Sequence, residues 1–480
     1  MESVLKYLDW TSVGLALLVG LLSLLLLELF RWNSFRSQSP PGPKSLPFVG
    51  NLPQFSKDQM GIIRSLPKYG EMCSIFLGRK PTIVLNNMQL AKEAFVQNGT
   101  VFSGRPLLPL QAWLTKGYGI ILANYGHSWR QQRRFALHTL RDFGLGKKTV
   151  EERVAEEAHY LIKEMLKQEV SNIICSIIFG DRFEYNDKRF AKLLEILNES
   201  IRLGGTTMAQ IFNLLPIIKY FPGPHQKIQH NFEALKKFLL EIVEEQKKTL
   251  DPDNPRDFTD EELKEDTTFH VENMMKSVFD LFIAGTETTA TTLRWGLVYM
   301  MNHPDVQERC HEEIIRVLGF DRSPCMEDRA QLPYTHATVY EIQRYASITP
   351  LGLIHQTTEP ALLRGYHLPK GSTIMVNLKA IMTDKQHWKY PDTFNPENFL
   401  DEKGQFCRND AFLPFSLGPR VCLGEYLAKM ELFIFFTSLL QRLKFSWPAG
   451  TPHPNMDGIV GTVRSPFPFN MICHSRETTH

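Results

Sequence analysis

The first apolar segment of the chain runs from Thr11 to Phe30 with hardly a polar side chain. A helix of about 20 apolar residues is long enough to cross a bilayer. A cleavable signal peptide ends in small residues at its cleavage site, which Leu29–Trp32 does not offer. Arg31, Arg36 and Lys44 follow the segment. Because basic residues stay on the cytoplasmic side, we predict an uncleaved single-pass anchor that leaves the rest of the chain in the cytosol.

Beyond this segment, the hydrophobic spacing predicts mostly helices with a little β-structure. The apolar runs Cys73–Leu77 and Thr82–Leu85 flank a turn and predict a hairpin. A second small β-cluster is expected near Gly371–Leu378. Val271–Met301 is apolar on most faces and predicts one long helix of about 45 Å. The pattern therefore favours a mainly α fold with small β-sheets, of the α+β class, in a single large domain.

The chain divides into three predicted parts. Residues 1–31 form the membrane anchor, and residues 32–48 form a basic, proline-rich linker that contains the stiff sequence Pro40–Pro43. Residues 49–480 form the globular domain, in which no internal repeat or low-complexity tract is visible. A domain of this length can bury a large hydrophobic core.

Composition narrows the class of protein. Hydrophobic residues make up 43% of the 480 positions and charged residues 22%, which is typical of a globular protein. The formal net charge of +2 gives no reason to expect a nucleic-acid partner. The seven cysteines are scattered and never occur in CxxC spacing, which argues against a zinc site. Such sparse cysteines suit the reducing cytosol.

The segment Phe415–Gly424 has the most unusual local pattern. Proline and glycine residues interrupt regular structure before Cys422, and apolar residues recur at helical spacing after it. Cys422 is therefore predicted in a stiff turn at a helix N-terminus, where free backbone N–H groups and the helix dipole stabilise a thiolate. Arg420 adds a positive charge two residues away. Taken alone, a cysteine is more often a small buried hydrophobic residue.

Phe415, Gly418, Arg420, Cys422 and Gly424 together resemble the haem-binding signature of the cytochrome P-450 superfamily. Every position that defines this signature is present, so the resemblance is highly specific. It implies that the cofactor is haem b and that Cys422 is the metal ligand, bound to the iron as a thiolate. It also implies that Arg420 pairs with a haem propionate and that Gly424 lies against the cofactor.

Two further stretches resemble propionate-binding elements of the same superfamily. Trp129 and Arg133 share one face of a predicted helix. His355 follows an apolar stretch at the position of a propionate-binding histidine. Without the cysteine signature, the first stretch would be interpreted as a solvated basic helix and the histidine as an ordinary polar residue.

The same basic helix is expected to meet an electron donor. Arg130 and Arg134 would face outward on the Cys422 side of the haem and, with Lys429, form a positive patch for an acidic protein. The resemblance implies NADPH–cytochrome P-450 reductase as the source of electrons, with cytochrome b5 as a second candidate partner.

The centre of the predicted long helix, Ala284–Thr289, contains a glycine, a carboxylate and several threonines, which are poor choices for a buried helix. Residues that disfavour a buried helix are concentrated at functional sites. The alternative is that these polar residues have no function and the helix simply tolerates them. The run resembles the superfamily's oxygen-activation motif. The resemblance implies that Ala284 borders the gap for dioxygen beside the haem, and that Thr288 and Glu287 are catalytic residues that relay protons.

Glu341 and Arg344 lie three residues apart on a predicted helix, which in isolation indicates a weak surface pair. In their position along the chain they resemble the Glu-x-x-Arg pair that locks the core of P-450 proteins. Asn398 replaces the usual third partner, an arginine, so we expect a looser lock. The candidate substrate-pocket residues are apolar and flank these motifs: Phe282, Ile283, Ile348, Leu351, Leu353, Ile459 and Val460.

The chain is identified as a member of the microsomal P-450 proteins of family 2, and within it most resembles the J subfamily. This resemblance implies a haem-thiolate monooxygenase that inserts one oxygen atom from dioxygen into lipophilic substrates. The expected substrates are polyunsaturated fatty acids such as arachidonate and linoleate, together with xenobiotics. The expected location is the endoplasmic reticulum membrane, with the catalytic domain in the cytosol.

Two alternatives remain open. Family-2 proteins carry more chain near Glu169 and Val170 than this sequence does, so one alternative is a shortened, poorly haem-loaded and non-catalytic variant. The other is a haem-thiolate isomerase that needs no reductase, and retention of Glu287 and Thr288 argues against it. The apolar segment Phe212–Pro224 is either a buried loop or a lid over the substrate channel that dips into the membrane.

Overall fold

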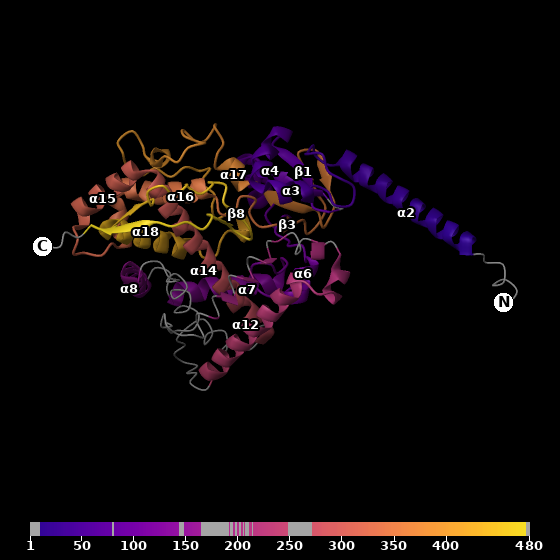
Figure 1. The fold of residues 1–480 in the computed structure, drawn as a ribbon, viewed down its shortest axis with the longest axis horizontal. Helices are drawn as coiled ribbons and strands as arrows, with labels where there is room; N and C mark the ends of the chain where they lie inside the picture. The colour runs from indigo at the N-terminus through magenta and orange to yellow at the C-terminus, as the bar shows by residue number, and fades with distance from the viewer. Residues whose placement is uncertain are drawn as a thin grey trace.

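The computed structural model describes most of the chain, and Figure 1 shows how its helices and strands are arranged. The described residues are 10–78, 81–143, 148–164, 211–213, 215–247 and 271–476, with a few isolated positions between 192 and 206. The shortening predicted near Glu169 and Val170 lies outside the described residues, so the alternative of a shortened variant stays a prediction.

The first described element is helix α2 (Trp10–Gln38), which projects away from the body of the protein in Figure 1. Within its stretch Val13–Gln38, the most apolar window of 18 residues has a mean hydropathy of 2.5 and is not buried at all. By length and composition, this helix could cross a membrane. The helix continues past residue 31, so the first part of the predicted linker is helical.

The rest of the predicted linker packs against the body. Pro40 and Pro43 are buried. Ser74 donates hydrogen bonds from its hydroxyl to the carbonyl of Pro40 at 2.6 Å and from its backbone N–H to the carbonyl of Pro41 at 3.0 Å. The packed part of the chain therefore begins near residue 40, earlier than the predicted boundary at residue 49.

The predicted hairpin is confirmed as part of a four-stranded sheet. Strands β1 (Met72–Phe76) and β2 (Pro81–Leu85) pair antiparallel, and β2 pairs parallel with β6 (Thr373–Val376). Strand β3 (His355–Gln356) pairs antiparallel with β6 at the edge of the sheet, in the order β1-β2-β6-β3. β6 is the second β-cluster that the sequence predicts. Because β3 begins with His355, the sheet fixes the position of this candidate haem-binding residue.

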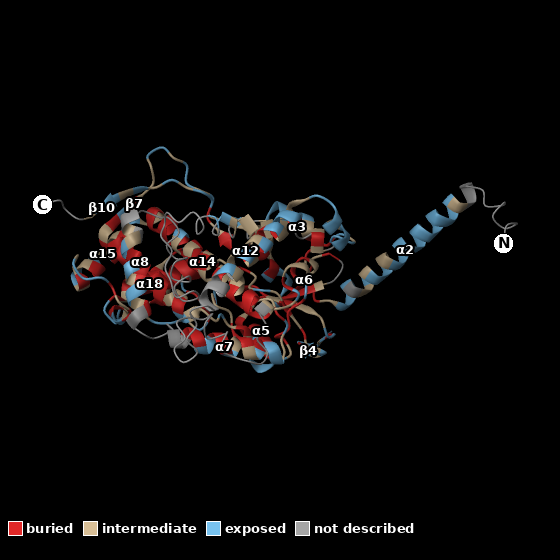
Figure 2. Cartoon of the chain, turned by 90° about the horizontal axis from the view of Figure 1, so that it is seen from below, coloured by how far each residue is buried: buried red, intermediate tan, exposed pale blue. Residues whose placement is uncertain are grey.

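Helix α14 (Val271–Asn302) confirms the predicted long helix and runs through the body. It packs against α16 (Pro333–Ala346) and α18 (Glu425–Arg442), and α18 also packs against α8 (Lys148–Glu164) and α15 (Pro304–Leu318). Figure 2 shows buried residues concentrated along these helices. The helix that follows Cys422 thus lies in the core, where it holds the cysteine turn in a fixed place.

The remaining elements are shorter or lie at the periphery. The helices are α3 (Leu52–Lys57), α4 (Gln59–Ser65), η1 (Leu66–Tyr69), α5 (Met88–Lys92), η2 (Glu93–Gln97), α6 (Pro109–Thr115), α7 (His127–Phe143), η3 (Pro216–Tyr220), α12 (Pro224–Lys247), η4 (Met326–Ala330), α17 (Leu378–Ile381), η5 (Pro396–Phe399) and η6 (Gly418–Arg420). The two-stranded sheets pair β4 (Ala361–Leu363) with β5 (Tyr366–Leu368), β7 (Leu443–Ser446) with β10 (Ile472–Ser475), and β8 (Ile459–Val460) with β9 (Arg464–Ser465). The fold is mainly α with small sheets, as predicted.

Candidate active site

Cys422 lies between η6 and the first turn of α18, as the sequence predicts. Backbone hydrogen bonds of 3.0 Å run from Val421 N to Gly418 O and from Cys422 N to Phe415 O, and they hold the turn. Gly418 has a φ of 78°, and a Cβ atom there would lie 1.9 Å from the carbonyl oxygen of Phe95. Only glycine therefore lets this loop approach η2 so closely.

The surroundings of the Cys422 thiol act on its pKa in both directions. Part of its surface is accessible, but the surrounding protein displaces water, and this desolvation raises its pKa. The Gly424 N–H group and the Arg133 guanidinium lower the pKa by less. The N–H group at the helix N-terminus thus acts in the predicted direction, while burial has the larger effect on the free thiol. A metal cation at the sulfur would supply the missing charge, since coordination deprotonates a thiol.

Arg420 ties the cysteine loop to the segment 103–123. It donates to the carbonyl oxygens of Ser103, Ile120 and Ala123 at 2.9, 3.3 and 2.8 Å. Its guanidinium lies 3.9 Å from the ring centroid of Trp129, and the Trp129 indole N–H donates to the same Ile120 carbonyl at 2.9 Å. Two predicted propionate-binding residues, Arg420 and Trp129, are therefore in direct contact.

Arg133 and His355 approach this region from other elements. Arg133, on α7, donates to the carbonyl of Val421 at 2.5 Å, beside the cysteine. The His355 Nδ1 atom lies 2.8 Å from the carbonyl oxygen of Phe102. Burial, followed by nearby guanidinium charges, lowers the pKa of His355 well below its usual value, so the ring is neutral at pH 7. The structure thus brings together all four predicted propionate-binding side chains.

Arg105 was not predicted, yet it lies buried in the same cluster. Its side chain donates to the carbonyl of Ile121 at 3.2 Å and to the carbonyl of Ile354, and burial lowers its pKa to about 10. Burial, followed by the charges of Arg105 and Arg133, also lowers the pKa of Arg420. Within the described part of the chain, none of these three arginines forms an ion pair with a carboxylate.

This arginine cluster (Arg105, Arg133 and Arg420) fits a dianionic group. Buried guanidinium groups that repel one another and bond only to carbonyl oxygens are strongly attracted to an anion. Haem carries two propionates, so its polar edge would supply the negative charge that this cluster of three cations lacks. The Cys422 thiol supplies the soft ligand that haem iron accepts. The residues present therefore fit haem both at the metal and at the propionates.

The centre of α14 carries the predicted catalytic pair. Thr288 Oγ1 donates to the carbonyl of Ala284, one turn earlier, at 2.7 Å. Glu287 accepts a hydrogen bond from Thr291 at 3.1 Å. Burial raises the pKa of Glu287, an effect that Thr291 and Arg294 partly offset. A carboxyl group with a raised pKa holds a proton closer to neutral pH, as a proton relay requires.

Thr289 connects α14 to the cysteine-bearing helix. Its hydroxyl donates to Glu431 Oε2 at 2.9 Å, and the other carboxyl oxygen of Glu431 is buried and has no partner among the described residues. Burial raises the pKa of Glu431 to about 8, so this group is mostly neutral at pH 7. Glu431 was not predicted, although an acid within the apolar run Met430–Phe436 was a usable signal. The contact fixes α14 against α18 one residue away from Thr288.

Glu341 and Arg344 form a fully buried ion pair on α16, with two N–O distances of 2.7 Å. The Asn398 amide nitrogen lies 3.3 Å from both carboxylate oxygens of Glu341. Asn398 thus occupies the place expected for the third partner, and its contacts with Glu341 are long. The remaining donors of Arg344 bind the backbone carbonyls of Met382, Tyr390, Pro391 and Thr393.

The candidate substrate-pocket residues do not all lie together. Phe282–Ile283 and Ile348 belong to the large core cluster around α14 and α18. Leu351 instead packs with a separate apolar cluster that includes strands β1 and β2. Leu353 is 41% exposed, and Ile459–Val460 forms strand β8, in which Ile459 is 46% exposed. Phe282–Ile283 and Ile348 thus share the core cluster of α14, the helix that carries the predicted catalytic pair, and the pocket role of the whole set stays a prediction.

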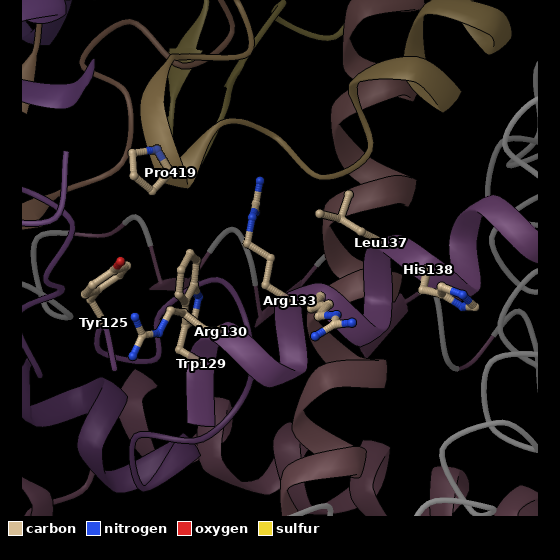
Figure 3. Close-up of a pocket in the computed structure, with 8 residues that line it drawn as sticks. Tyr125, Trp129, Arg130, Arg133, Leu137, His138 and Pro419 are labelled. Atoms are coloured by element: carbon tan, nitrogen blue, oxygen red, sulfur yellow. The ribbon is translucent and has the colours of Figure 1, made fainter. Parts of the chain in front are cut away.

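Arg130, Arg133 and Arg134 line a cavity of about 570 Å³ on α7. Figure 3 shows Pro419 of the cysteine loop opposite Trp129 and Arg133 across this cavity. Arg130 and Arg134 are exposed, as predicted. The face of α7 beside the cysteine loop is therefore basic.

Lys429, the third predicted member of this basic face, has an acidic neighbour. Its ammonium group lies 2.5 Å from a carboxylate oxygen of Glu425, one turn earlier on α18. The ion pair offsets part of its charge, and its place in the positive patch stays a prediction.

Comparison with known proteins places this site in a family. The sequence profile of the cytochrome P450 family matches residues 40–472. The match starts at Pro40, where the packed body begins. It therefore covers the sheet, the helical core and every candidate site residue.

Individual relatives match over nearly the whole chain. Chicken (Gallus gallus) cytochrome P450 2H1 is 44% identical over 90% of this chain and 93% of its own length. Rabbit (Oryctolagus cuniculus) cytochrome P450 2C5 is 43% identical over 95% of this chain and 98% of its own length. Mouse (Mus musculus) cytochrome P450 2J5 is 44% identical over 88% of this chain and 89% of its own length. The similarity is equal across these subfamilies, so it confirms family 2 without singling out the J subfamily. The chain belongs to the cytochrome P450 family and is a family 2 monooxygenase.

Proposed function

We propose that this monooxygenase holds haem b through Cys422 and oxygenates polyunsaturated fatty acids and lipophilic xenobiotics. The observation that carries the proposal is the Cys422 thiol beside the arginine cluster, which forms no ion pair within the described residues. When bound, haem supplies the chemistry that activates dioxygen and inserts one of its oxygen atoms into a C–H or C=C bond.

The protein's own residues orient the cofactor and move protons. Arg105, Arg133 and Arg420, with the Trp129 N–H, would bind the two propionates and fix the plane of the ring. On α14, the Thr288 hydroxyl would turn from the Ala284 carbonyl toward the cofactor. Glu287, whose raised pKa keeps a proton available, would then return a proton to the Thr288 hydroxyl.

Thr288→Ala is expected to separate NADPH consumption from product formation. Without the hydroxyl, protons reach the reacting oxygen through disordered water, so product per NADPH should fall roughly tenfold to a hundredfold. Thr288→Ser keeps the hydroxyl and is the matched control, which should stay close to the parent protein. Measuring NADPH loss and product in the same reaction tests this, and unchanged coupling in Thr288→Ala would remove Thr288 from the relay.

An exposed apolar segment supports substrate uptake from a membrane. Around η3, the side chains of Leu215, Ile217, Tyr220 and Phe221 are between 56% and 74% exposed. A patch of this kind on a soluble surface is unfavourable, but it is stabilised in the headgroup region of a bilayer. We therefore propose that the segment is the predicted lid and that it dips into the same membrane that α2 crosses.

The basic face of α7 supports an acidic electron donor. Charge reversal at two exposed positions, Arg130→Glu with Arg134→Glu, should slow electron transfer from the NADPH–cytochrome P-450 reductase by about tenfold or more at low salt. The defect should shrink as ionic strength rises, because screening removes the repulsion. Stopped-flow reduction measures this rate, and equal rates at all salt concentrations would place the donor elsewhere. Reversal of Lys403, which is also exposed but lies outside α7, is the control.

One experiment tests the whole proposal. One sample of the full-length protein, purified in detergent, is reduced under carbon monoxide, and a second sample, in air without carbon monoxide, is supplied with reductase, NADPH and arachidonate. We expect a thiolate-type red-shifted absorption band and oxygenated arachidonate that appears only when NADPH and reductase are both present. Conversion of a peroxide substrate without reductase would favour the isomerase, and the absence of the band would favour a variant that does not hold haem. Parallel assays with drug-like amines would rank the two substrate classes.

A further inference from the structure

A cavity of about 890 Å³ lies where α4 meets α17. These two helices pack against each other and lie side by side in Figure 1. None of the residues that the proposed function uses for haem, oxygen or substrate lines this cavity. The structure therefore contains a second hollow whose role is not explained by the proposed monooxygenase chemistry.

Lys379 is the unusual residue in this cavity. Its ammonium group donates to the carbonyl of Tyr345 at 3.2 Å and lies 4.9 Å from the centroid of the Tyr345 ring. An ammonium group has three donors, so most of its hydrogen-bonding capacity is unused. Among the described residues it forms no ion pair. Burial, followed by the charges of Arg464 and Arg344, lowers its pKa to about 7.

The other cation in the depth of the cavity also lacks an acidic partner of its own. Arg464 is 5% exposed, and its guanidinium donates to the backbone carbonyls of Ala346, Met456 and Asp457. Among the described residues, the carboxylates that act on Lys379 and Arg464 are already paired, Asp457 with Arg64 and Glu341 with Arg344. Lys379 and Arg464 have no carboxylate of their own there, which leaves the inner part of the cavity positive.

The remaining charged residues lie nearer the mouth of the cavity. Glu71, Lys385 and Asp392 line the cavity and are exposed. The Asp384 carboxylate lies 3.9 Å from Nε2 of His387. Acidic side chains at the mouth repel large polyanions such as nucleic acids. A small anion that passes them would reach the positive inner part.

We propose that this cavity binds a small anion with a phosphate or carboxylate group, held by the Lys379 ammonium and the Arg464 guanidinium. Charge-assisted hydrogen bonds from such a group would use the donors of Lys379 that the protein leaves free. The anion would also relieve the repulsion between the two cations, because it neutralises both at once. The site does not depend on the proposed function, since no haem-binding residue takes part.

Pyridoxal 5′-phosphate tests the site, because it joins an aldehyde to a phosphate. Its aldehyde condenses with an uncharged lysine amine to an imine and water, and borohydride reduces the imine to a stable amine. The full-length protein is labelled at pH 7 and mapped by peptide mass spectrometry. We expect Lys379 to react at least about tenfold faster than the exposed Lys385 at the same cavity. Inorganic phosphate should slow labelling of Lys379 alone by about fivefold.

Two matched variants complete the test. At constant ionic strength, phosphate should raise the melting temperature of the parent protein and of Lys385→Met, but not that of Lys379→Met. Equal labelling of Lys379 and Lys385 would overturn the proposal, and so would potassium chloride that slows the labelling of both equally. Both outcomes are measured on the parent protein, so they hold even if Lys379→Met fails to fold. Vesicles of phosphatidylglycerol distinguish the source of the phosphate: protection by vesicles alone indicates a lipid headgroup, and protection by free phosphate indicates a soluble anion.

Discussion

Cys422→Ser protein is expected to lose both the thiolate-type spectrum and its monooxygenase product. Serine keeps the size of the side chain but removes the soft sulfur that the haem iron prefers. Mutations beside a metal ligand commonly reduce affinity or activity by about 10–100-fold, and loss of the ligand itself should exceed that. The reduced protein under carbon monoxide reports the ligand, and product analysis with reductase and NADPH reports the activity.

Cys407→Ser is the matched control for this experiment. Cys407 is another free, exposed cysteine, and it lies outside the candidate site. The Cys407 variant should keep the red-shifted band and normal product formation. A thiolate-type band that survives in Cys422→Ser, with haem still bound, would show that a different side chain holds the metal.

Arg344→Met is expected to lower the free energy of unfolding by about 3–5 kcal/mol. The change leaves Glu341 buried without its cation, and an unpaired buried charge is far more costly than a lost surface pair. It also removes the Arg344 donor from four backbone carbonyl oxygens, of which that of Tyr390 keeps the Asn398 amide as a second donor. Urea titration of the variant and the parent protein, followed by tryptophan fluorescence, measures the difference.

A double variant separates loss of charge from loss of packing. Arg344→Met combined with Glu341→Leu removes both ions, so it should be less destabilised than Arg344→Met alone. If the two changes are simply additive, the ion pair does not stabilise the core in the proposed way.

The sequence predicts those features that depend on neighbouring residues. The breakers before Cys422 and the helical spacing after it lie within one short segment, and the structure has the turn and the helix there. The hairpin and the long helix α14 follow from local spacing in the same way. The pair Glu341 and Arg344 was placed correctly because its members are one helical turn apart.

Three features that depend on distant segments or on packing were not predicted, although the resemblance had grouped Trp129, Arg133, His355 and Arg420. Arg105 stands directly before Pro106 with no motif around it, and only the fold carries it to Arg420. The raised pKa of Cys422 comes from protein packed around the loop, which local sequence does not reveal. The ion pair between Lys429 and Glu425 was likewise not predicted.

The carbonyl partners of Arg420 have a consequence for biosynthesis. The Ile120 carbonyl lies 300 residues before Arg420 in the chain. A ribosome that adds roughly 5–20 residues per second needs roughly 15–60 s to make the intervening polypeptide. The two walls of the haem pocket therefore leave the ribosome far apart in time, so a nascent chain cannot retain the cofactor until translation is nearly complete.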